Sequence, residues 1–117
     1  MSPILKNIFL WAGLALALIV GIGSLQPGLP ATAFSLHDKV EHFIAYGAIA
    51  GLLALGRPAA SAKSVFLAVG LYGTAIEVLQ HVIPSLGRTG SIWDVVANLA
   101  GIGAAVCIAR EINRHWG

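Results

Sequence analysis

The sequence predicts an all-α integral membrane protein, a compact bundle of about four transmembrane helices with short loops, forming one domain over residues 1–117. Hydrophobic residues make up 57% of the chain and charged residues 10%, against roughly 25% in soluble domains. The mean hydropathy is +0.84. No Asp, Glu, Lys or Arg lies between Lys6 and Asp38. Such a chain has too little polar surface to coat a soluble globule, and too many apolar residues to be disordered.

The cysteine count and the charge exclude several classes of structure and function. The single cysteine, Cys107, excludes an intramolecular disulfide framework and a multi-cysteine metal site. The net charge is +2 and the isoelectric point about 9.0, but no basic cluster accompanies them. We therefore expect no nucleic-acid partner.

The first helix is expected over about residues 4–25, because Ile8 to Leu25 is apolar or small. A secretory signal is the alternative, since Ala31-Thr32-Ala33 follows the apolar run as a cleavage site would. The apolar run is longer than the roughly 7–15 residues of such a signal. An uncleaved helix is therefore favoured.

Three weakly charged runs follow, and Pro or Gly residues separate them. We expect helices over about 38–56, 63–83 and 91–111. With four spans, the Lys and Arg residues at the helix ends fall mostly on one side: Lys6, Arg57, Lys63, Arg110 and Arg114. The positive-inside rule makes that side cytoplasmic, so both termini are expected in the cytoplasm.

Ionisable and amide residues collect on the other side of this topology. They are Asp38, Lys39, Glu41 and His42 at the start of the second helix, Glu77, Gln80 and His81 at the end of the third, Arg88 in the loop, and Asp94 and Asn98 at the start of the fourth. An ionisable group at the centre of a membrane helix costs about 2.5–3.5 kcal/mol. The carboxylates must therefore pair with one another, with Lys39 and Arg88, with water or with a ligand.

Two interpretations of this cluster stay open. It is either an internal ion-pair network that fixes the helices, or an outward-facing pocket that binds a ligand or performs chemistry. We favour the pocket, because three separate helices supply ionisable residues at one side of the membrane.

The polar residues also form an ordered set of motifs. They read D-K-x-x-H from Asp38 to His42, E-x-x-Q from Glu77 to Gln80, and R-x-x-S-x-x-D-x-x-x-N-x-x-G from Arg88 to Gly101. This set resembles the VanZ-like family over about residues 36–103. The resemblance implies a small multi-helix protein of the bacterial inner membrane, and a link to glycopeptide resistance, because the founding member is tied to low-level teicoplanin resistance.

The first functional hypothesis is a membrane-embedded enzyme or binding protein for an anionic lipid-linked cell-envelope substrate, such as a polyprenyl phosphate. Arg88 and Lys39 would hold phosphate oxygens. His42, oriented by Asp38, would act as general base, and Glu77 as proton donor. The remaining candidate substrate-binding residues are Gln80, Asp94 and Asn98.

The alternative is a non-catalytic membrane scaffold whose polar cluster is structural. A metal site built from Asp38, His42, Glu77 and Asp94 has the right donor chemistry but lower weight, so no metal or cofactor is expected. Ion transport ranks last, because the inner halves of the helices are apolar. Membrane lipids are the expected partners, and the sequence decides neither catalysis nor oligomeric state.

Overall fold

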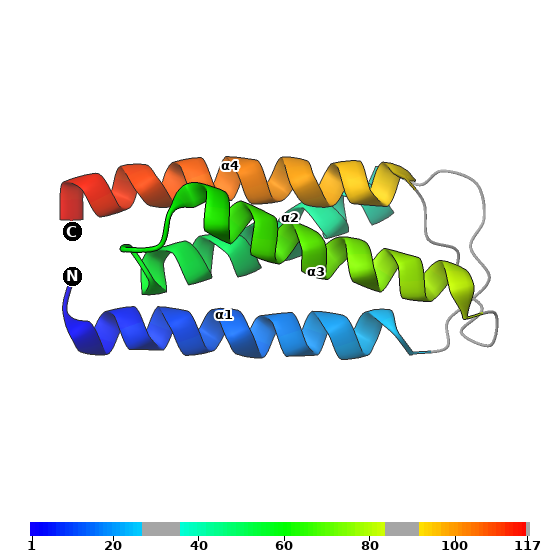
Figure 1. Cartoon of the computed structure of the whole chain (residues 1–117), viewed down its shortest axis with the longest axis horizontal. Coiled ribbons are helices and arrows are strands. Elements are labelled where there is room, and N and C mark those ends of the chain that lie inside the picture. The colour runs from blue at the N-terminus through cyan, green and yellow to red at the C-terminus, as the bar shows by residue number, and fades with distance from the viewer. Residues whose placement is uncertain (27–35, 84–91, 117) are drawn as a thin grey trace.

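The computed structural model describes residues 1–26, 36–83 and 92–116, and these form four helices without a strand. The helices are α1 (Pro3–Ser24), α2 (Leu36–Gly56), α3 (Ala62–Val82) and α4 (Ile92–Trp116). They lie side by side along one long axis, with both termini at the same end (Figure 1). The predicted all-α bundle is confirmed. The second helix begins earlier than residue 38, and the fourth runs beyond the expected residue 111 to Trp116.

Serine caps begin two of the helices. The Ser2 side chain accepts a hydrogen bond from the Leu5 amide at 3.2 Å, and proline follows at the start of α1. The Ser61 side chain accepts one from the Ser64 amide at 3.1 Å at the start of α3. Each cap satisfies a backbone donor that has no partner inside the helix, so these two starts are encoded locally.

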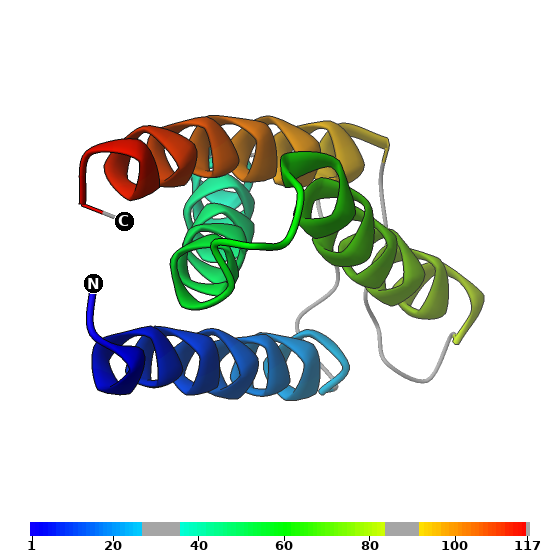
Figure 2. The same cartoon turned by 60° about the vertical axis from the view of Figure 1, so that its left-hand side comes forward.

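Three of the four helices are long and apolar enough to cross a membrane: α1, α3 and α4. Helix α2 has a similar length of 21 residues, but its first turns carry Asp38, Lys39, Glu41 and His42. It lies between α1 and α4 (Figure 2) and packs most extensively on α4. The helix with the most polar start is thus the central one of the bundle.

Small residues let α2 and α4 approach closely. A methyl group at Gly47 would lie 3.0 Å from the Gly101 carbonyl oxygen, and one at Gly51 would lie 3.6 Å from the Ala105 side chain. A methyl group at Gly101 would overlap the Phe43 carbonyl oxygen. The glycine stripe of α2 therefore faces α4 inside the chain, in the manner of small-residue interfaces between membrane helices.

The apolar core lies along the same interface between α2 and α4, which we call the seam. Ile49, Ala50, Ile102 and Val106 are at most 4% exposed and pack between α2 and α4. By contrast, α1 turns most of its large side chains outward, including Ile8, Trp11 and Leu18. An outward apolar surface of this kind suits contact with lipid.

Candidate functional site

The predicted site lies at the end of the bundle opposite the termini, which we call the polar end (Figure 1). It comprises the first turns of α2, the last turns of α3 and the first turns of α4. Among the described residues, all the buried polar and charged side chains occur here: Glu77, Gln80, Asp94 and Asn98, each at most 6% exposed. Burial of such groups is costly unless they are paired, so their contacts decide what the polar end does.

Lys39 joins α2 to α4. Its ammonium group contacts Asp38 Oδ2 at 3.2 Å and also Asp94 Oδ1, and its side chain is 15% exposed. Asp94 is 7% exposed at its side chain and Asp38 46%. The buried charge of Lys39 is thereby held between two carboxylates, of which Asp38 is the more accessible.

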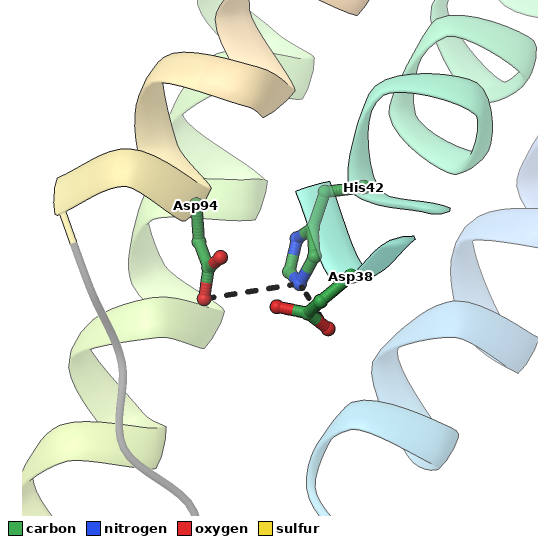
Figure 3. A group of neighbouring side chains, drawn as sticks. All are labelled: Asp38, His42 and Asp94. Atoms are coloured by element: carbon green, nitrogen blue, oxygen red, sulfur yellow. Dashed lines mark ion pairs between the residues drawn. The ribbon is translucent and has the colours of Figure 1, made fainter. Parts of the chain in front are cut away.

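His42 lies at the centre of the polar end, where its two ring nitrogens face different groups. Nδ1 is 2.9 Å from Asn98 Oδ1 and 3.7 Å from Glu77 Oε1. Nε2 is 3.9 Å from Asp38 Oδ1 and 3.9 Å from Asp94 Oδ2, as Figure 3 shows. An amide oxygen and a carboxylate beside Nδ1 favour a proton on that nitrogen, which leaves the Nε2 lone pair directed at the other two carboxylates.

Asp38, predicted to orient His42, lies 3.9 Å from Nε2, whereas Asn98 is within hydrogen-bond distance of Nδ1 at 2.9 Å. Glu77, the predicted proton donor, is 4% exposed and lies on the Nδ1 side. The predicted general base and the predicted proton donor are therefore neighbours, and Glu77 lies on the opposite edge of the imidazole from Nε2.

Gln80 turns away from this centre toward α1. Its amide nitrogen donates a hydrogen bond to the Ser24 carbonyl oxygen at 2.7 Å. Deeper in the bundle, the Tyr72 hydroxyl donates to the Ala17 carbonyl oxygen at 2.5 Å. Two side chains of α3 thus fasten α1, whose own sequence offers no ionisable group to the site.

A cavity of about 220 Å³ opens beside His42, between α1, α2 and α3. Its lining includes Asp38, Glu41, His42 and Tyr46 from α2, Gln80 from α3, and Val20 and Ser24 from α1. Tyr46 is 1% exposed, its ring stacks on His42 with the centroids 6.3 Å apart, and its hydroxyl has no hydrogen-bond partner among the described residues. A buried hydroxyl without a partner is uncommon in folded proteins, and a water molecule or a ligand atom beside it would satisfy it.

The structure brings together seven of the eight predicted site residues, and Arg88 lies outside the described residues. Sequence reasoning missed the contribution of α1, because a backbone carbonyl such as that of Ser24 leaves no mark in the sequence. Tyr46 follows His42 by about one helical turn, and this spacing is the signal in the sequence that both side chains share a face of α2.

The family model VanZ/LLP1 matches residues 6–113. The chain belongs to the VanZ-like family. The match extends over α1, beyond the region of the motifs. No curated protein and no solved structure matches this VanZ-like chain.

Proposed function

We propose that this VanZ-like chain is a multi-pass protein of the bacterial inner membrane whose polar end binds, and acts on, an anionic lipid-linked cell-envelope substrate. One observation carries the proposal. Ionisable side chains from three helices lie within 4 Å of one another at one end of the bundle, Lys39 and His42 of α2 with Glu77 of α3 and Asp94 of α4, beside a cavity that Asp38 and His42 line. Ionisable residues within membrane helices mark functional sites by default.

The contacts of Lys39 suggest how an anion would enter. Its ammonium group is held by Asp94, which is buried, and by Asp38, which is 46% exposed. A phosphate oxygen would replace Asp38 at Lys39, and the displaced carboxylate would swing toward His42 Nε2, now 3.9 Å away. Arg88 would supply a second, bidentate contact. The exposed apolar faces would take the lipid chain.

Native mass spectrometry of the detergent-purified protein tests the binding step. The wild type should carry an anionic lipid that is lost in Arg88→Ala and in Lys39→Ala. Lys63→Ala is the matched control, because Lys63 is exposed near the opposite end of the bundle. A lipid retained in all three variants, or absent from the wild type, would contradict the proposal.

The catalytic step has a separate test. His42→Ala and Glu77→Gln should each abolish the cellular phenotype of the protein while it remains inserted and folded. For a link to glycopeptide resistance, that phenotype is teicoplanin susceptibility in an expressing host. Full phenotype in both variants would argue against catalysis at His42.

The interhelical contacts favour a second candidate, a membrane scaffold. Lys39 with Asp94, His42 with Asn98 and Gln80 with Ser24 each connect two helices. A scaffold should tolerate exchange of the two charges in Lys39→Asp with Asp94→Lys, so that folding and phenotype recover together. A binding site should recover folding alone.

A further inference from the structure

Asp38, His42 and Asp94 each direct one atom that could bind a metal ion toward the same point of the polar end. Asp38 Oδ1 and Asp94 Oδ2 are each 3.9 Å from His42 Nε2, and one atom from each of the three residues falls within 4.8 Å of the others (Figure 3). At 3.9 Å these atoms are too far apart for direct hydrogen bonds. Two ligands that share one ion at about 2.0–2.2 Å lie up to about 4.4 Å apart, so the two 3.9 Å separations from Nε2 are within the range for a shared cation.

The surroundings of His42 prepare Nε2 for such an ion. Asn98 Oδ1 lies 2.9 Å from Nδ1, with Glu77 Oε1 behind it at 3.7 Å. A histidine that binds a metal usually donates its other N–H to an oxygen of this kind, which fixes the tautomer. The Nε2 lone pair then faces one oxygen of each of two carboxylates, and imidazole nitrogen with carboxylate oxygens is a donor set that a divalent cation accepts.

The carboxylate oxygens are divided in the same way. Lys39 contacts Oδ2 of Asp38 and Oδ1 of Asp94, whereas the oxygens nearest Nε2 are Oδ1 of Asp38 and Oδ2 of Asp94. Lys39 therefore contacts a different oxygen of each carboxylate from the one that lies nearest Nε2.

The cavity is a second observation that favours a binding site, because two of the three residues lie in its lining. It is lined by Asp38 and His42, and by Tyr46, which is 1% exposed and whose hydroxyl has no hydrogen-bond partner among the described residues. Because Asp38 and His42 line the cavity, two of the three ligands are accessible from it, which leaves coordination positions for water or for an oxygen of a bound molecule.

We propose that Asp38, His42 and Asp94 form a binding site for one divalent transition-metal cation, of the class of Mn²⁺ or Zn²⁺. Two carboxylates and one neutral imidazole are donors that both ions accept. The site goes beyond lipid binding and does not depend on it, because the cation is expected to bind the protein alone.

Titration of the tag-free, chelator-treated protein in detergent with Mn²⁺ and with Zn²⁺ tests the site, by calorimetry and, for Mn²⁺, by electron paramagnetic resonance. We expect one ion per chain. His42→Ala and Asp94→Asn should weaken its affinity at least about 100-fold, and Asn98→Leu, which removes the group that orients His42, by about 10–100-fold.

Two variants keep the test decisive if those proteins fold poorly. Lys39→Met removes a positive charge beside the ion and should tighten binding by more than about fivefold. His37→Ala is the matched control, because His37 pairs with Glu41 at 2.9 Å on the exposed surface of the same end. It should leave the affinity unchanged. No saturable binding by either ion, an equal loss in His37→Ala, or no tightening in Lys39→Met would overturn the proposal.

Discussion

The seam between α2 and α4 has two halves that are joined in different ways. At the polar end, Lys39 pairs with Asp94, and His42 contacts Asn98. One turn further along both helices, Gly47 meets the backbone of Gly101, and Gly51 then meets Ala105. The two helices run in the same direction, so a single line of contacts changes from charged pairs to small residues.

This difference shows how a membrane protein can hold charged groups in a fixed arrangement. Glycine contacts are short and have little freedom to slide, because the neighbouring atoms are backbone. The apolar half therefore sets the distance and register of the two helices. This distance and register in turn determine which polar side chains lie opposite one another at the polar end. Polar contacts between membrane helices contribute only about 0.6–2 kcal/mol each, so the charged pairs alone would fix the spacing and register of the helices only weakly.

The largest expected effect is at the apolar half. In Gly101→Ala the new methyl group would overlap the Phe43 carbonyl oxygen, and we expect a loss of about 3 kcal/mol in the free energy of unfolding. Gly103→Ala is the matched control on the same helix, since its methyl group would meet Phe66 at an ordinary 3.7 Å. Denaturant titration in micelles, followed by circular dichroism, measures both. Equal stability of the two variants would mean that the seam does not set the register.

A smaller effect is expected at the polar half. Asp94→Asn removes the buried partner of Lys39 and leaves the ammonium group with Asp38, so we expect a loss of about 1–3 kcal/mol in the free energy of unfolding. Glu111→Gln breaks exposed pairs with Arg114 and His115 and should change the same quantity by less than about 0.5 kcal/mol. A stable Asp94→Asn protein would show that the charged pair is dispensable for folding.

The smallest effect tests single hydroxyl groups. Tyr72→Phe removes the hydrogen bond to the Ala17 carbonyl and should cost about 0.6 kcal/mol of the free energy of unfolding. Tyr46→Phe removes a buried hydroxyl that lacks a partner among the described residues, and should be neutral or slightly stabilising. The same unfolding assay compares them. A larger loss in Tyr46→Phe would indicate that its hydroxyl already holds a molecule in the folded protein.

Most of the fold could be predicted, because the physical signals are local. The long gap in charge before Asp38 and the Pro and Gly breaks place the four helices, and helical spacing places Asp38 beside His42. That Glu77 and Asp94 avoid lipid follows from the cost of a charge in hydrocarbon.

The pairings within the site could not be predicted in the same way. Whether Lys39 meets Asp94 or a ligand depends on the register of α2 against α4, which the glycine contacts set through tertiary packing. Helix α1 lines one side of the cavity with Val20 and Ser24, and neither is an ionisable or motif residue that would have indicated this role in the sequence. The sequence therefore indicates which residues share the polar end, while their contacts require the three-dimensional arrangement.

The separation of Lys39 from Asp94 along the chain also has a consequence for biogenesis. The two residues are 55 positions apart. At about 5–20 residues per second, a ribosome needs roughly 3–11 s to add the second after the first. During that interval the polar first turns of α2 have been made, and the α4 residues that pair with them have not. Packing of the polar first turns of α2 is therefore expected to be completed late, when α4 has been made, whereas α1 is long and apolar enough by itself to cross a membrane.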